Sequence, residues 1–163
     1  MKDPRSKSTA TRENAMTVAE RDAFLSQRLL SRLCTIRSDG WPHATPVWFL
    51  WEDGAFLHSL GPNRQHLRNI AVNPRVTECI DVDHRLERGL AAGASAVVCF
   101  GEARIIEDES EAREMLERIL RHYLGPEDGK KYLEPSLAEL PLGRRMVRVT
   151  PQRWLTWDFR KAD

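Results

Sequence analysis

Two Asp-Gly pairs, Asp39-Gly40 and Asp53-Gly54, separate three runs of residues that favour β-strands. Asp-Gly is a preferred pair in two-residue hairpin turns, because such turns need a positive φ angle that glycine adopts without strain. A turn this short joins only antiparallel neighbours. The spacing therefore predicts a three-stranded antiparallel meander over Leu33–Arg37, His43–Trp51 and Ala55–Ser59.

Further strand patterns follow in the second half of the chain. Arg75–Val82 alternates apolar and polar residues, and Ala94–Ile106 opens with a continuous apolar run. Arg145–Val149 and Arg153–Phe159 give two closing strands on either side of Thr150-Pro151. Six or seven strands with few helices predict a mainly β fold, a small antiparallel β-barrel with added helices.

Helices are expected before and between these strands. Thr17 and Glu20 form a capping box, which starts a helix that runs to about Leu30. The segment 83–93 is charged and rich in glycine and alanine, so it is expected to be a loop. Other helical patterns lie at Arg64–Val72 and at Ser110–Leu124, which has one apolar face. A short helical turn is expected within Lys130–Leu142, between Pro135 and Pro141.

The first residues differ in composition from the rest of the chain. Residues 1–15 are charged and rich in serine and threonine, without the apolar run that a signal peptide or a membrane anchor needs. The remaining length suits one domain with its own core. We expect a disordered N-terminal lead-in over 1–15 and a single barrel domain over 16–163.

Composition argues against several classes of partner. The chain has 25 Lys and Arg against 24 Asp and Glu, whereas nucleic-acid binders carry a marked basic excess. Its apolar stretches fall well short of the roughly 20 residues needed to cross a bilayer. Cys34, Cys79 and Cys99 lack CxxC spacing, which is typical of buried free thiols in a reducing cytoplasm. The five histidines show no HxxxH or HxH spacing, so no metal site is expected.

Four stretches, taken in order, resemble the pyridoxamine 5′-phosphate oxidase-like family of flavin-binding split barrels. They are Leu33–Phe49, Gly61–Val76, Gly101–Ala103 and Thr150–Phe159, and the resemblance extends over roughly residues 17 to 160. It implies a six-stranded antiparallel split barrel of the FMN-binding type that works as a homodimer, with the cofactor in a groove between two protomers. It also implies that the turn after the third strand receives the cofactor phosphate and that the partner's C-terminal region closes the site.

The turn from Gly61 to His66 is suited to an anion. It leads into the N-terminus of a short helix, where free amides and the positive end of the helix dipole favour negative charge. Arg64 can donate two parallel hydrogen bonds to phosphate oxygens, and Ser59 can add a hydroxyl. We expect Ser59, Arg64, Gln65 and His66 to bind a phosphate; the alternative is an ordinary solvated surface turn.

His66 departs from the family pattern. Many relatives carry a lysine where His66 aligns, and an imidazole with an ordinary pKa near 6.5 is not assured of a charge at neutral pH. A bound phosphate would favour its protonated form. The substitution bears on cofactor affinity and identity.

The second expected strand, His43–Trp51, carries the residues expected near the cofactor ring. By resemblance, backbone groups around Thr45, Pro46 and Val47 meet the pyrimidine side of an isoalloxazine. Pro46 has no amide proton, which suits a position where the backbone faces a ligand or an edge. At least one of Trp48 and Phe49 must pack in the core, since successive strand residues face opposite ways.

Two tryptophans near the C-terminus are three residues apart. Trp154 and Trp157 should therefore point to opposite faces of a strand, one to the core or an interface and one to the cofactor. The resemblance favours Trp157 as the cofactor-facing residue, with Arg153 as a polar contact.

No Ser-His-Asp or Cys-His arrangement can be read from the chain, and no catalytic residue is assigned. Flavin enzymes need few such groups, because the cofactor carries the hydride chemistry.

The leading hypothesis is an oxidoreductase that binds FMN non-covalently and transfers a hydride or electrons to a small planar substrate. An alternative in the same fold uses the deazaflavin F420, whose longer acidic tail would need additional Lys or Arg. Another is a non-catalytic flavin- or haem-binding module, which for haem would need an axial histidine in the groove.

Overall fold

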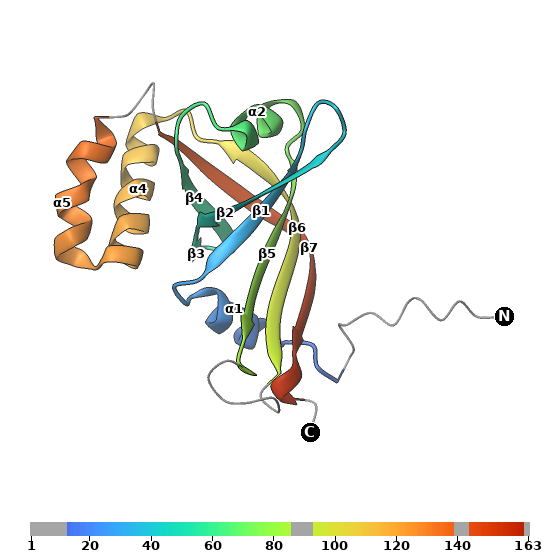
Figure 1. The fold of residues 1–163 in the computed structure, drawn as a ribbon. Coiled ribbons are helices and arrows are strands. Elements are labelled where there is room, and N and C mark those ends of the chain that lie inside the picture. Colours follow the sequence, from blue (N-terminus) through green and yellow to red (C-terminus); the bar gives the residue numbers. More distant parts are fainter. Residues whose placement is uncertain (1–12, 86–92, 139–143, 162–163) are drawn as a thin grey trace.

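The computed structural model describes residues 13–85, 93–138 and 144–161 (Figure 1). Seven strands form one antiparallel sheet: β1 (Leu30–Ile36), β2 (Pro42–Trp48), β3 (Leu50–Glu52), β4 (Ala55–Leu60), β5 (Arg75–Asp83), β6 (Ala94–Ile105) and β7 (Arg145–Asp158). The helices are α1 (Val18–Leu25), α2 (Gln65–Val72), α4 (Glu109–Leu124), α5 (Pro126–Leu137) and the short 3₁₀ helix η2 (Phe159–Lys161).

The sheet has the strand order β2-β1-β5-β6-β7-β4-β3. Figure 1 shows it curled, and the edge strand β2 contacts β4 near the opposite edge. The mainly β split barrel that the sequence predicts is therefore confirmed. It has seven strands where the resemblance implies six, because the segment 43–51 is divided between two strands while the two expected closing segments form one.

That division lies at Phe49. The segment predicted as one strand from His43 to Trp51 forms β2, which pairs with β1, and β3, which pairs with β4. Both Asp-Gly pairs lie in hairpins, but only Asp53-Gly54 forms a two-residue turn, since residues 37–41 make a longer loop around Asp39-Gly40. The predicted three-stranded meander is wrong, because the two hairpins lie at opposite ends of the sheet order. Phe49 is fully buried at the break, so the chain changes partners while keeping that ring in the core.

The two predicted closing strands are one long strand, β7. It pairs with β6 along its length, with a shift in register between Phe100 and Gly101 that leaves Gln152 without a partner. The shift falls next to Pro151, which has no amide hydrogen to contribute to the ladder. The Thr150-Pro151 pair therefore marks a bulge and not a strand end.

The core fills the inside of the curl, with a second cluster beneath α4. Leu33, Phe49, Phe56, Ile80 and Val97 are completely buried in the first cluster. In the second, Leu57 packs with the apolar face of α4. Strand β4 is buried along almost its whole length, because it lies between the two clusters. The α4 hairpin with α5 is thus a fixed part of the barrel wall.

The predicted helices are present with changed bounds. Helix α1 starts at the expected capping box of Thr17 and Glu20, whose two hydrogen bonds are both formed, and it ends earlier than expected. Helices α2 and α4 match their patterns. Helix α5 was not predicted: it begins with Pro126 in its first turn, where a proline costs no hydrogen bond. It ends at Leu137, and the turn expected between Pro135 and Pro141 runs on into residues outside the described part.

The ends of the barrel domain lie together. Asn14 O accepts a hydrogen bond from Asp158 N at 2.8 Å, and Ala15 O accepts one from Lys161 Nζ at 2.9 Å. Residues 13–15 of the predicted lead-in are thus held against the end of β7, and residues 1–12 lie outside the described part. Most of the predicted loop, residues 86–92, also lies outside it. Within the described helices, none is long and apolar enough to cross a membrane.

All three cysteines are free thiols. Cys99 is buried, and its burial raises the pKa of the thiol to about 12. Cys34 and Cys79 are half-buried, and burial raises the pKa of each above its ordinary value. These thiols are protonated at neutral pH and are poor nucleophiles.

Candidate functional site

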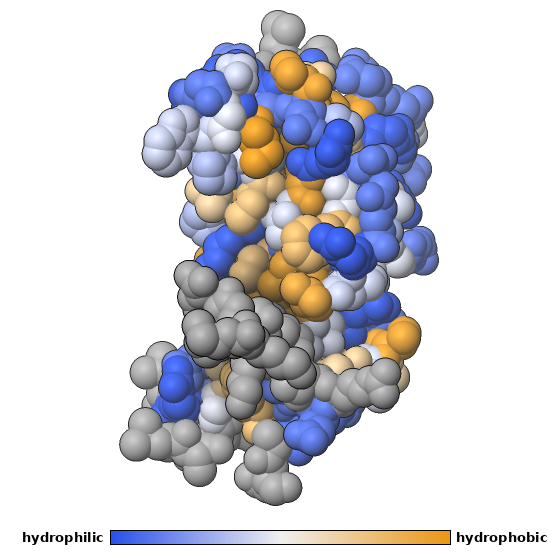
Figure 2. Space-filling model, turned by 90° about the vertical axis from the view of Figure 1, so that its right-hand side faces the viewer, coloured by the Kyte–Doolittle hydropathy of each residue, from blue (hydrophilic) through white to orange (hydrophobic). Residues whose placement is uncertain are grey.

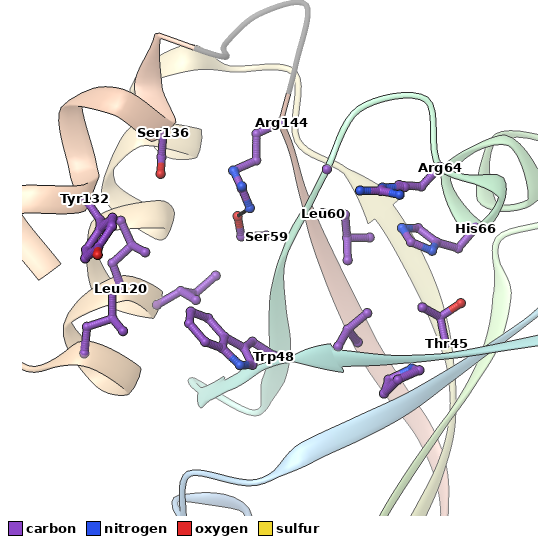
Figure 3. Close-up of a pocket in the computed structure, with 15 residues that line it drawn as sticks. Thr45, Trp48, Ser59, Leu60, Arg64, His66, Leu120, Tyr132, Ser136 and Arg144 are labelled. Atoms are coloured by element: carbon purple, nitrogen blue, oxygen red, sulfur yellow. Dashed lines mark hydrogen bonds between the residues drawn. The ribbon is translucent and has the colours of Figure 1, made fainter.

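A pocket of about 580 Å³ lies between the sheet and the α4–α5 hairpin (Figure 3). Strands β2 and β4 and the start of α2 form one side, and the two helices form the other. Its volume falls in the range of pockets that hold cofactors and drug-sized ligands. One end is lined by cationic and hydroxyl groups, and the other is mostly apolar.

The polar end is built around the turn between β4 and α2. Arg64 is the N-cap residue of α2, and its side chain caps none of the free amides there. On the other side of Leu60, Arg144 Nη1 donates a hydrogen bond to Ser59 Oγ at 3.2 Å. Figure 3 shows the two arginine side chains on either side of Leu60, with Arg144 beside Ser59 and Arg64 beside His66. Two guanidinium groups, a hydroxyl and a helix N-terminus together suit an anion such as phosphate.

His66 lines the same end and is buried. Among the residues that the structure describes, its Nε2 atom has no hydrogen-bond partner. Burial, together with the nearby charges of His43, Arg64 and His58, lowers the pKa of His66 to about 4, so the imidazole is neutral at pH 7. Leaving a buried polar atom unpaired costs about 1–3 kcal/mol of folding free energy. A ligand that forms a hydrogen bond with Nε2 would remove this cost.

The apolar end is formed by Trp48 of β2 and by the facing helices. The indole of Trp48 stacks on the ring of Tyr123, with centroids 4.4 Å apart and planes 3° apart. Ile119, Leu120 and Leu124 of α4 continue this surface. A rigid aromatic and aliphatic wall of this kind suits the flat face of a ring system.

Hydrogen bonds from Tyr123 fix that wall to the break between β2 and β3. Its hydroxyl accepts a hydrogen bond from Phe49 N at 3.1 Å, and it lies 2.5 Å from Leu29 O and 3.0 Å from Phe49 O. These contacts tie α4 to the main chain at Phe49 and at Leu29, just before β1. Trp48 is thereby held with one face against Tyr123.

A buried polar network supports the same break from inside the barrel. His58 Nδ1 lies 2.9 Å from Trp48 O, and His58 Nε2 lies 2.8 Å from Glu78 Oε1. Ser31 Oγ donates a hydrogen bond to the other carboxylate oxygen of Glu78. Burial lowers the pKa of His58, but the charge and hydrogen bond of the Glu78 carboxylate outweigh this effect and hold the pKa above its ordinary value.

The predicted cofactor residues divide into two groups. Thr45, Pro46, Val47, Ser59, Arg64 and His66 all line this pocket. Gln65 does not: its amide donates to Asn69 Oδ1 at 2.7 Å, and its Oε1 accepts from Arg68 Nη2 at 3.0 Å. In this chain Gln65 therefore orders helix α2.

The remaining two, Arg153 and Trp157, lie on what we call the outer sheet face. This face consists of residues of β1, β5, β6 and β7 that point away from the core: Arg32, Cys34, Thr77, Cys79, Val98, Phe100, Arg153, Leu155 and Trp157. Arg153 lies over the ring of Phe100, with Cζ 4.4 Å from its centroid, and lines a second hollow of about 400 Å³. Neither Arg153 nor Trp157 reaches the first pocket of its own chain.

Trp154 and Trp157 lie on opposite faces of β7, as their spacing predicts. Trp154 faces inward against Trp51, and the guanidinium of Arg21 lies 4.3 Å from its ring centroid. Likewise, of the pair Trp48 and Phe49, Phe49 is the core residue and Trp48 lines the pocket.

Sequence reasoning did not find Arg144 or the wall from α4 and α5, which includes Tyr132 and Ser136. Arg144 stands just before β7, far along the chain from the turn it faces. The apolar face of α4 was visible in the sequence as a packing surface, but nothing local distinguishes its pocket-lining residues from its core residues.

Fold and site together define a class of protein: a curled antiparallel split barrel with an anion-suited turn after β4. The family model described as "Pyridoxamine 5'-phosphate oxidase" matches residues 17–158. The chain belongs to this family.

Solved structures agree with this fold. A conserved hypothetical protein from Mycobacterium tuberculosis is 24% identical with a TM-score of 0.81, over 95% of this chain and 92% of that one. An F420 reductase is 22% identical with a TM-score of 0.58, over 82% and 94%. HutZ, a haem storage protein from Vibrio cholerae, is 20% identical with a TM-score of 0.62, over 88% and 97%. A search of curated proteins found no match.

Proposed function

We propose that the chain binds a phosphate-bearing flavin, FMN, non-covalently in this pocket and acts as an oxidoreductase on a small planar substrate. The observation that carries the proposal is the division of one pocket into a cationic end and an aromatic end. A ligand that joins an anionic group to a flat ring system matches both ends. The family membership and the flavin- and F420-binding neighbours support the same class of ligand.

The residues present fit such a cofactor. Arg64, Ser59 and Arg144 would hold its phosphate, and the unpaired Nε2 of His66 would gain a partner. Residues 45–47 and Trp48 would orient the ring and keep water from one of its faces. When bound, a flavin supplies hydride or electron transfer, so the protein's own task is to bind, orient and exclude water.

We further propose that the active form is a homodimer joined through the outer sheet face. Figure 2, which looks onto the right-hand side of Figure 1, shows apolar side chains running down the middle of this side. Leu155 is 42% exposed there, and Phe100 and Trp157 are only half-buried. Exposed apolar sheet faces of this kind mark protein interfaces. In such a dimer, Arg153 and Trp157 would approach the cofactor of the partner subunit.

One observation favours F420 as a second candidate. The acidic tail of F420 would need a cation outside the turn from Gly61 to His66. With F420 bound, Arg144 would contact this tail, and Arg64 and Ser59 alone would hold the phosphate. The F420 reductase among the structural neighbours is in accord with this choice. A haem-binding function, as in the haem storage protein, is the non-catalytic alternative.

Absorption spectroscopy tests these proposals directly, because FMN, F420 and haem have distinct spectra. We expect the purified protein, or the apoprotein titrated with each compound, to bind FMN with the spectrum of an enclosed flavin. Preferential binding of F420 would replace FMN in the proposal, and a haem spectrum would overturn the flavin function. A protein that binds none of the three would remove the basis for a redox function.

A further inference from the structure

We propose that His66 takes up a proton when an anion binds at the polar end of the pocket, so that anionic ligands bind more tightly at mildly acidic pH. The inference rests on the proposed function in one respect, that an anion occupies the N-terminus of α2. It goes beyond that function by assigning a protonation change to one residue and a pH dependence to cofactor binding.

The geometry isolates one nitrogen of His66. The side chain is 5% exposed, and no described residue bonds to its Nε2. The residue belongs to the first turn of α2 and lines the pocket with Ser59 and Arg64. An anion held by these groups would therefore be the first hydrogen-bond partner available to Nε2.

The charged and titratable groups around His66 are mostly cationic. Arg64 precedes it on the chain, and the His43 ring of β2 lies 6.2 Å away between centroids. His58 of β4 bonds to the Glu78 carboxylate, and Arg144 lines the same pocket just before β7. Together with burial, the charges of His43, Arg64 and His58 lower the pKa of His66 to about 4.

A bound anion opposes the effect of these cationic groups on the pKa of His66. Negative charge in contact with Nε2 favours the imidazolium, and a charge-assisted hydrogen bond adds to the effect. Because the pKa of His66 is then higher in the complex than in the free chain, binding takes up a proton. Affinity rises as pH falls from the pKa of the complex toward about 4, by at most about tenfold for each pH unit. A lysine at this position would carry its charge in both states and would show no such linkage.

Inorganic sulfate is a suitable probe, since it remains a dianion throughout this range. We would titrate the protein with sulfate, and separately with FMN, by calorimetry in buffers of different ionisation enthalpy near pH 6. A net uptake of protons is expected, with an affinity for sulfate about tenfold higher near pH 5.5 than near pH 7.5. Absence of sulfate binding, or binding without proton uptake, would overturn the proposal.

Two variants assign the proton to His66. His66→Asn keeps a hydrogen-bond donor that does not titrate, and His66→Lys carries a fixed charge, so both should bind sulfate with little pH dependence. His43→Gln removes the neighbouring imidazole and should retain the dependence. A full pH dependence in His66→Asn, or its loss in His43→Gln, would place the proton elsewhere.

NMR of the wild-type protein gives a readout that needs no variant. The imidazole resonances of His66 should titrate at a higher pH with saturating sulfate than without it, and an unchanged titration would contradict the proposal.

The FMN titration separates this inference from the proposed function. Proton-linked sulfate binding without FMN or F420 binding would leave the inference standing and remove the function. Tight FMN binding by a protein whose sulfate binding takes up no proton would do the opposite.

Discussion

His58 Nε2 lies 2.8 Å from Glu78 Oε1 inside the barrel, and neither side chain is exposed to solvent. This pair joins β4 to β5, and through Nδ1 it also holds Trp48 O beside the pocket. Breaking a buried pair by removing one partner leaves an uncompensated group in a medium that solvates it poorly. Loss of either side chain should therefore lower the stability of the fold and loosen the main chain at Trp48, which lines the pocket.

Glu78→Gln should lower the free energy of unfolding by about 3–5 kcal/mol, because it leaves the His58 imidazole without its carboxylate. Urea unfolding of the two single variants and of the double variant His58→Gln/Glu78→Gln gives the coupling between them. We expect the double variant to be less destabilised than the sum of the single ones. Additive effects would show that the pair does not act as a unit.

The same pair predicts a pH dependence of stability. The Glu78 carboxylate raises the pKa of His58 in the folded chain above the value of about 6.5 in the unfolded chain. Its contribution is complete below about pH 6.5 and is lost as pH rises toward the folded pKa. Wild type should therefore lose stability relative to His58→Gln as pH rises above about 6.5. His66 acts below this pH, and the ionisation of unfolded thiols near pH 8.5 is common to both proteins.

Tyr123→Phe should destabilise the protein by about 1–3 kcal/mol while leaving the stack on Trp48 in place. The reason is that Phe49 N would lose its hydrogen-bond acceptor at the break between β2 and β3. Tyr132→Phe, at a half-exposed tyrosine of α5, is the matched control and should change stability by less than about 0.5 kcal/mol. Equal effects of the two changes would argue against the role given to Tyr123.

Features that depend on local sequence were predictable. The Asp-Gly turns, the capping box at Thr17 and the helix start after Arg64 each depend on residues a few positions apart, and all are present. The turn from Gly61 to His66 was identified as suited to an anion for the same reason. The groups that suit this turn to an anion belong to residues that are neighbours in the sequence.

Features that depend on distant contacts were not predictable. The break at Phe49 is held by Tyr123, 74 residues away, and Ser59 meets Arg144, 85 residues away. A strand that changes partners has the same alternation of residues as one that does not, so the pattern from His43 to Trp51 was read as continuous. The family resemblance supplied the barrel, but it gave no information on the wall that α4 and α5 add to the pocket.

Gly101→Ala should destabilise the pairing of β6 with β7. A Cβ atom at Gly101 would lie 2.6 Å from Thr150 O and 3.1 Å from Val149 Cγ1, so the backbone would have to move, at a cost of about 1–3 kcal/mol. Amide hydrogen exchange should accelerate in β6 and β7 around the register shift. Gly40→Ala, in an open turn with φ +84°, should strain only its own hairpin and leave exchange in β6 and β7 unchanged.

Leu155→Glu tests the proposed dimer. The residue is exposed in the middle of the outer sheet face, where a buried charge in an interface would be strongly unfavourable. Light scattering should show wild type as a dimer and the variant as a monomer at micromolar concentration. Val72→Glu, at an exposed apolar residue of α2 away from this face, should remain dimeric. A monomeric wild type would contradict both the dimer and a site shared between protomers.

Arg64→Ala tests the phosphate site. Each charge-assisted hydrogen bond contributes about 1.5–3 kcal/mol, so losing one should weaken FMN binding by roughly tenfold to a hundredfold. Fold and dimer should be retained, because the side chain is exposed on the turn and caps no amide of α2.

The matched control for Arg64 is Arg68→Ala, one helical turn further along α2. Arg68 bonds to Asn63 O and Gln65 Oε1 and does not line the pocket, so its loss should leave FMN affinity unchanged. Comparing the two variants by fluorescence titration separates loss of a phosphate contact from a general loss of positive charge near α2. If Arg64→Ala bound FMN and F420 as tightly as the parent, the anion would have to lie elsewhere, and the pocket between the sheet and α4–α5 would lose its assignment as the cofactor site.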